Sequence, residues 1–200
     1  MSTTAWILLV VIGLPMLGLA VGIPLGKRRL DAGARTVLDR RPGWSYSALG
    51  NGVDAGVLAL VPERLEPPVS WALVGPAAVD GRPELSARAQ AFRVSTRSNQ
   101  RNRTGTHYTV ASLGFDRTTL PMADFRLRQQ FVLPAGAEAV PTARVTELLQ
   151  QYDMGVRLSG DRAVAWSKQW HDLPTAAGMT DALLELVSLL PAEVLEVEQQ

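Results

Sequence analysis

The feature that most constrains this chain is an uncharged stretch of 22 residues, Ala5 to Gly26. As an α-helix it would be roughly 33 Å long, and the hydrocarbon core of a bilayer is about 30 Å thick. A signal peptide has a basic segment before a shorter apolar run, whereas here the tail over residues 1–4 holds no charged side chain. The sequence therefore predicts an uncleaved transmembrane helix over residues 5–26, with cleavage near Ala20 and Gly22 as the alternative.

The charges around this stretch predict its orientation. Basic residues are absent before it and concentrated after it, and Lys and Arg favour the cytoplasmic side of a membrane. These residues are Lys27, Arg28, Arg29, Arg35, Arg40 and Arg41. We therefore expect a single-pass protein of the cell membrane, with the N-terminus outside, the C-terminal domain in the cytoplasm, and the basic cluster against anionic lipid headgroups.

Two glycines within the stretch, Gly18 and Gly22, have the G-x-x-x-G spacing that lets two transmembrane helices approach closely. This spacing favours a homodimer. Glycine is common in such helices, however, so a lipid-facing helix accounts for the same residues.

Composition excludes several classes of function. The formal net charge of the 200 residues is only +1, which argues against bulk electrostatic binding of nucleic acid. The chain has no Cys, which excludes disulfides, thiolate zinc sites and cysteine catalysis. The part after the stretch suits one domain. We expect a basic juxtamembrane segment over residues 27–42, a soluble domain over 43–192 and a frayed acidic tail over 193–200.

Apolar residues at helical spacing predict helices over residues 30–41, 141–152 and 181–190. The first ends at the breaker pair Pro42-Gly43 and has an apolar face. That face consists of Leu30, Ala34, Val37 and Leu38. In the last helix, Thr180 is the expected N-cap.

Alternating and β-branched residues predict two hairpins and a further strand. The ranges are 85–96 with 106–115, 154–158 with 162–166, and 123–133. Apolar runs at 57–61 and 71–74 are expected as short strands or partly buried loops. The predicted class is α+β: a transmembrane helix followed by a mainly antiparallel sheet of about five strands with two or three helices.

Few residues are candidates for catalysis or metal binding. The only histidines are His107 and His171, and Asp172 or Asp161 could orient His171 in a nucleophilic triad. The chain has no G-x-S-x-G elbow and no metal-ligand spacing such as H-E-x-x-H. We therefore expect both histidines to be structural, and no cofactor or metal site.

Two further groups of residues are candidates for contacts. Arg97, Arg101 and Arg103 concentrate positive charge at the tip of the first predicted hairpin, where forked guanidinium donors suit lipid phosphates or an acidic partner. An ordinary solvated loop is the simpler interpretation. Trp166 and Trp170 are expected to pack in the core rather than against a ligand.

Several segments together carry a resemblance to a known group of proteins. They are the apolar stretch closed by Lys27-Arg28-Arg29, then Gly43-Trp44-Ser45-Tyr46, then a sheet, then Val156 to Trp166 (VRLSGDRAVAW). In these the chain resembles uncharacterised single-span membrane proteins of GC-rich Gram-positive bacteria of the actinobacterial type. The resemblance implies no activity and no site residues.

The sequence favours a non-enzymatic binding or scaffolding module at the membrane surface. Membrane lipid and an unidentified membrane protein are the expected partners, and the residues expected to contact them are Lys27, Arg28, Arg29, Arg97, Arg101 and Arg103. One alternative is a membrane-bound hydrolase that uses His171 and Asp172, and another is a small subunit of a membrane complex.

Overall fold

A computed structural model describes residues 28–50, 53–62, 65–96, 106–127, 131–133 and 136–197, with only the backbone at 55, 66–68 and 197. The predicted span over 5–26 and its Gly18 and Gly22 lie outside these residues, as do Lys27 and the arginines at 97, 101 and 103. Within the described ranges, no helix is both long and apolar enough to cross a bilayer.

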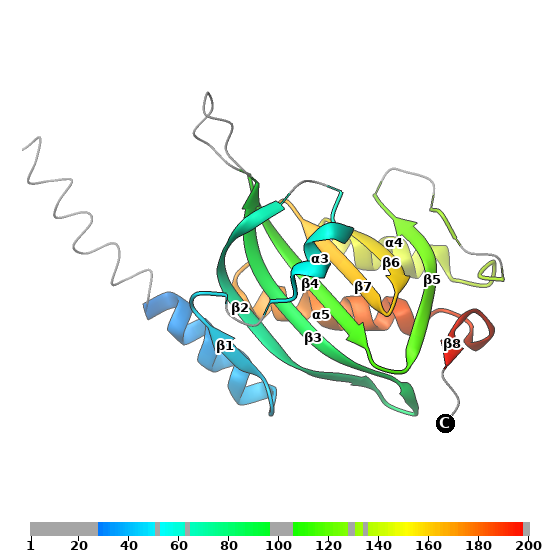
Figure 1. Ribbon diagram of the computed structural model, residues 1–200, viewed down its shortest axis with the longest axis horizontal. Coiled ribbons are helices and arrows are strands. Elements are labelled where there is room, and N and C mark those ends of the chain that lie inside the picture. Colours follow the sequence, from blue (N-terminus) through cyan, green and yellow to red (C-terminus); the bar gives the residue numbers. More distant parts are fainter. Residues whose placement is uncertain are drawn as a thin grey trace, which may run out of the picture.

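The fold is α+β, as predicted, and is built on an antiparallel sheet (Figure 1). The strands are β1 Ser45–Ser47, β2 Leu65–Val79, β3 Arg82–Thr96, β4 His107–Phe115, β5 Thr118–Phe125, β6 Met154–Gly160, β7 Arg162–Ser167 and β8 Glu196–Val197. Their order across the sheet is β1-β2-β3-β4-β7-β6-β5-β8. Both predicted hairpins are confirmed as β3–β4 and β6–β7, and the apolar run at 71–74 lies within β2.

The β6–β7 hairpin lies between two strands that follow each other in the chain. Only residues 116–117 separate β4 from β5, yet β7 pairs with β4 and β6 pairs with β5 (Figure 1). The backbone N–H of Phe115 donates to the carbonyl of Asp161 over 2.8 Å, which joins the end of β4 to the hairpin turn. Gly160 precedes that turn with φ +60°, a conformation that favours glycine.

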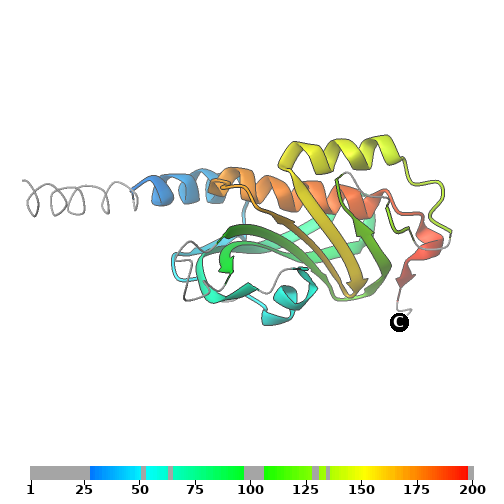
Figure 2. The same cartoon turned by 90° about the horizontal axis from the view of Figure 1, so that it is seen from above.

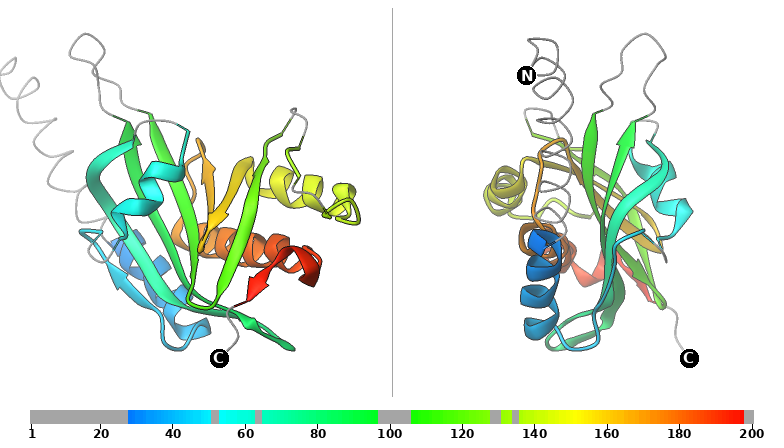
Figure 3. Two further views of the ribbon diagram at one scale, coloured as in Figure 1. Left: turned by 45° about the vertical axis from the view of Figure 1, so that its right-hand side comes forward. Right: turned by 90° about the vertical axis from the view of Figure 1, so that its left-hand side faces the viewer.

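Helices cover both faces of the sheet. The helix over residues 28–40, α4 (Thr142–Tyr152) and α5 (Leu173–Ser188) lie on one face, and α3 (Ala55–Leu60) lies on the other (Figures 2 and 3). A 3-10 turn, η2 (Ala192–Val194), follows α5. The predictions of the first helix and of α4 are confirmed, and Val145, Leu148 and Leu149 of α4 are buried as its periodicity indicates.

The apolar run at 57–61 is mostly helical, so its prediction as a strand or loop was wrong. Asp54 precedes α3 as its N-cap, and the Asp54 side chain accepts a hydrogen bond from the N–H of Gly56 over 2.8 Å. Val57 and Val61 are buried against the sheet in the cluster that includes Phe92. Burial of one turn against the sheet therefore decides its conformation, and a run of this length carries too little periodicity to reveal that.

The last helix begins at Leu173 rather than at Asp181. Asp172 is its N-cap, because Asp172 Oδ1 accepts from the N–H of Thr175 over 2.9 Å. Thr180 is buried inside the helix, where its hydroxyl donates to the carbonyl of Ala177 over 2.6 Å. Gly178 is tolerated in the helix interior for a packing reason: a Cβ there would lie 2.7 Å from the Tyr152 hydroxyl.

Two further predictions need correction. The strand expected over 123–133 is β5, which starts earlier, at Thr118, and ends at Phe125. Beyond it, the backbones of Asp124 and Val132 bond each other reciprocally at 3.0 and 3.2 Å, so the chain returns on itself instead of extending. The acidic tail is not frayed at Glu196, because β8 pairs with the start of β5 and the side chain of Leu195 is buried.

Candidate functional site

The helix over residues 28–40 packs against the first turns of α5. Ala34 and Val37 are buried in a cluster with Leu173 and Ala176, which confirms the apolar face predicted for these two residues. A Cβ at Gly33 would be 3.6 Å from Cβ of Leu173, so the two helices approach closely there. The helix is therefore part of the domain core rather than a separate juxtamembrane arm.

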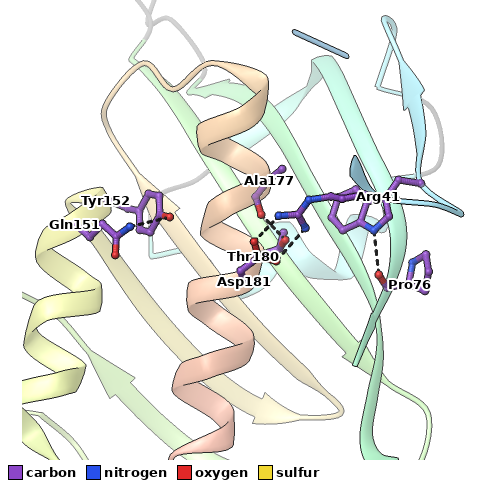
Figure 4. A network of polar contacts seen from close by, with 8 residues as sticks. Arg41, Pro76, Gln151, Tyr152, Ala177, Thr180 and Asp181 are labelled. Carbon is purple, nitrogen blue, oxygen red and sulfur yellow. Dashed lines mark hydrogen bonds and ion pairs between the residues drawn. The ribbon is translucent and has the colours of Figure 1, made fainter. Parts of the chain in front are cut away.

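Polar contacts hold the other end of this helix (Figure 4). Arg41, directly after it, forms a forked ion pair with Asp181 of α5. The Arg41 guanidinium also lies over the Trp44 ring, 4.8 Å from its centroid, and the Trp44 indole N–H donates to the carbonyl of Pro76 over 3.0 Å. These contacts join the helix to α5 and β2, so they fix its direction relative to the sheet.

A pocket of about 630 Å³ opens at the start of this helix. Its volume is in the range of small-molecule sites, about 300–1,000 Å³. Three segments supply its lining: the first turns of the helix, neighbouring positions of β2 and β3, and the chain that leads into α5. The lining residues are Arg29, Leu30, Gly33, Ser70, Trp71, Arg93, Trp170, His171, Asp172, Leu173 and Pro174.

Arg93, on β3, is the unusual side chain of this pocket. It is only 8% exposed, and within the described part of the chain its guanidinium has no hydrogen bond and no ion pair. The Arg93 guanidinium instead makes a cation–π contact with Trp170, whose ring centroid lies 3.1 Å from the guanidinium carbon. Burial lowers the pKa of Arg93, but an arginine keeps its charge in proteins. The pocket thus contains a buried positive charge that forms no ion pair with the described residues.

Trp170 covers Arg93 and remains largely exposed, at 72%. His107 of β4 meets it edge to face, with ring centroids 6.2 Å apart. The prediction that Trp166 and Trp170 both pack in the core is confirmed for Trp166, which lies in the cluster with Val110 and Val164, and is wrong for Trp170. β7 ends at Ser167, so its alternation of faces does not reach Trp170.

One feature of the sequence points to this site although it belongs to no motif. Arg93 interrupts an apolar run on β3, between Phe92 and Val94, both of which are fully buried. Arginine is almost never buried without a partner. An arginine in a strand that is buried on both faces therefore indicates a function for its charge.

The geometry around His171 does not support the hydrolase alternative. His171 Nε2 lies 3.2 Å from the Tyr152 carbonyl oxygen and 3.1 Å from Ser167 Oγ. A carbonyl only accepts, so a hydrogen bond to it requires the tautomer with the proton on Nε2, and in that tautomer Nε2 cannot act as a base toward the Ser167 hydroxyl. Ser167 is also 1% exposed. The Asp172 side chain is used as the N-cap of α5, and Asp161 lies at the opposite end of β7.

Several charged groups elsewhere in the domain pair with each other. Asp124 receives hydrogen bonds from Arg126 and Arg157, and Arg162 pairs with Asp54. Among the residues that the structure describes, no three His, Cys, Asp or Glu side chains are grouped so that they could hold a metal ion. Of the predicted basic contact residues within those ranges, Arg28 and Arg29 are exposed, and Arg29 lines the pocket.

Comparisons with known proteins return no match: no family model, no curated protein and no solved structure is similar to this chain.

Proposed function

We propose that this chain is a single-span membrane protein whose domain is a non-enzymatic binding module at the cytoplasmic membrane surface, with the Arg93 pocket as its ligand site. The observation that carries this proposal is the unpartnered charge of Arg93 in a pocket with largely apolar walls. A buried cation is costly unless it is paired, so a ligand that supplies an anion would be stabilised there.

The short distance along the chain between the pocket and the uncharged stretch supports a location of the pocket at the membrane surface. Arg29 and Leu30 line the pocket, and Arg29 is three residues after Gly26, where the uncharged stretch ends. Three residues of chain span at most about 11 Å. If the stretch spans the bilayer, this edge of the pocket lies within that distance of its end. Because the helix over residues 28–40 is packed into the domain, the pocket keeps this position.

Fractionation of cells that express the full chain tests the proposal. The protein should stay with membranes after high-salt and alkaline washes. Of the reporters fused after Gln200, those that function in the cytoplasm should be active, and those that function only outside the cell should not. A control with Ile12→Lys and Leu14→Lys should be released, because each central charge opposes insertion by about 2.5–3.5 kcal/mol. Release of the unmodified chain, a mature N-terminus near Val21, or activity of a reporter that works only outside the cell would contradict the proposal.

A further inference from the structure

We infer that the ligand of the Arg93 pocket is an anionic phospholipid, held by its phosphate on Arg93 and by its apolar part along Leu30 and Trp170. This inference rests on the proposed function, because it needs the pocket to lie at the membrane surface. It names the class of ligand. It follows from three observations: the free donors of Arg93, the apolar walls of the pocket, and the short distance along the chain between the pocket edge and the end of the uncharged stretch.

The donors of Arg93 are available to an anion. Trp170 lies over the guanidinium, and the five N–H groups of a guanidinium lie in its plane, so a ring on its face leaves them free. Phosphate oxygens match this fork in a bidentate way, and such charge-assisted hydrogen bonds are about twice as strong as neutral ones. Arg29 is a second cation at the same pocket, exposed at its rim.

The one carboxylate that lines the pocket does not neutralise this site. Asp172 forms no ion pair with Arg93 within the described residues, and its Oδ1 accepts the N–H of Thr175 at the first turn of α5. The positive end of the helix dipole there offsets part of the Asp172 charge. An anion on Arg93 therefore meets a lining with two cations, Arg93 and Arg29, and one carboxylate, that of Asp172, whose charge is partly offset.

The walls favour a ligand with an apolar part. Two apolar lining residues are open to solvent, Leu30 at 38% and Trp170 at 72% exposed, whereas Trp71 and Leu173 are almost fully buried. A free phosphate ion would fill only a small part of 630 Å³ and would leave the surfaces of Leu30 and Trp170 in contact with water. A phospholipid provides both the anion and the apolar chain, and it is present at high local concentration beside residues 29 and 30.

Tryptophan quenching in nanodiscs tests the inference. The full chain is placed in phosphatidylcholine nanodiscs, and brominated phosphatidylglycerol is added in increasing mole fraction. Bromine quenches indole fluorescence on close contact, so quenching that saturates reports occupancy. The unmodified chain should saturate at a low mole fraction, whereas Arg93→Gln should need at least about tenfold more lipid, and brominated phosphatidylcholine should give no saturable component.

Matched variants separate the pocket from general charge effects. Arg35→Gln removes an exposed arginine from the helix over residues 28–40, at a position that does not line the pocket. The lipid mole fraction at which this variant saturates should be within twofold of that of the unmodified chain. Leu30→Glu places a negative charge at the pocket edge and should weaken binding about as much as Arg93→Gln. Ala32→Glu places the same charge two residues further along, at an exposed position outside the pocket lining, and it should not weaken binding. Leu30→Glu changes a half-exposed residue, so it keeps the test decisive if Arg93→Gln fails to fold.

Three outcomes would overturn the inference. Binding by Arg93→Gln and by Leu30→Glu that equals binding by the unmodified chain would show that the pocket does not hold the lipid. Equal quenching by both brominated lipids would show no preference for an anion. Protection by millimolar inorganic phosphate alone would identify a free phosphate as the ligand. In each case the chain can still remain in membranes after alkaline washing, so failure of this inference is distinct from failure of the proposed anchoring.

Discussion

Arg41 and Asp181, 140 positions apart, form a forked ion pair that joins the end of the helix over residues 28–40 to α5. Arg41 also lies over the Trp44 ring, and the Trp44 indole N–H donates to the carbonyl of Pro76, so these two side chains together connect the helix to α5 and β2. The pair is the polar counterpart of the buried contact between Gly33 and Leu173 at the start of the helix. Together they hold the pocket lining on this helix against the lining on α5.

The Arg41–Asp181 pair should give a measurable coupling energy. We expect Arg41→Gln and Asp181→Asn each to lower the free energy of unfolding, with a coupling of about 0.5–1 kcal/mol, because Asp181 is largely exposed and the pair is screened by solvent. Denaturant unfolding of the two single variants and the double variant of the full chain in mild detergent measures this. The coupling should shrink in 1 M salt; a coupling of zero at low salt would show that the pair contributes nothing.

Gly75 of β2 should not tolerate a side chain. A Cβ at this position would lie 2.3 Å from Trp44 Cγ, and Trp44 is held by its bond to Pro76 and by Arg41. Gly75→Ala should therefore cost about 1–3 kcal/mol of unfolding free energy, as overpacked sites do. The matched control is Gly114→Ala on β4, where a Cβ would meet nothing within 4 Å. Equal thermal midpoints for the two variants would contradict the prediction.

Asp124 should make stability depend on pH in the acid range. Burial raises the pKa of its carboxyl, but hydrogen bonds at 2.8–2.9 Å from Arg126 and Arg157, together with their charges, lower it below the ordinary value. The folded-state pKa is thus below the unfolded one. The resulting stabilisation is fully present above the unfolded pKa of about 3.9 and is lost as pH falls through the folded pKa.

Asp124→Asn should accordingly be less stable than the unmodified chain at pH 7, and the difference should narrow below about pH 4. Thermal midpoints at pH 7, 5, 4 and 3 measure the difference. Asp80→Asn, at the exposed turn between β2 and β3, is the control and should keep the profile of the unmodified chain. A constant difference between Asp124→Asn and the unmodified chain over this range would refute the assignment.

Asp172 should act as a helix cap and not as a catalytic charge. Asp172→Ala removes the acceptor for the N–H of Thr175 and should lower the free energy of unfolding by about 1 kcal/mol. Asp172→Asn keeps an acceptor oxygen and should come within a few tenths of a kcal/mol of the unmodified chain. Denaturant unfolding compares the two variants, and an Asn variant as unstable as the Ala variant would argue for a role of the charge itself.

The hairpins and the two amphipathic helices were predictable because their signals are local. Alternation over β3 and β4, the glycine turn at Gly160, and the helical spacing of Val145, Leu148 and Leu149 lie within short windows of sequence. Where tertiary packing overrides the local pattern, prediction failed. α3 is helical because Val57 and Val61 are buried against the sheet, and α5 contains Gly178 because the Tyr152 hydroxyl occupies the space that a side chain would need there.

By itself the sequence determined the uncharged stretch, the charge asymmetry after it, the lack of cysteine and the α+β class, since composition and period are properties of neighbours along the chain. Only the tertiary structure decided that β6 and β7 lie between β4 and β5, and that Trp170 covers Arg93. Alternation tells which face of a strand is buried but not which strand lies beside it. The pocket depends on such long-range neighbours, because three distant segments build its walls and none of them carries a motif of its own.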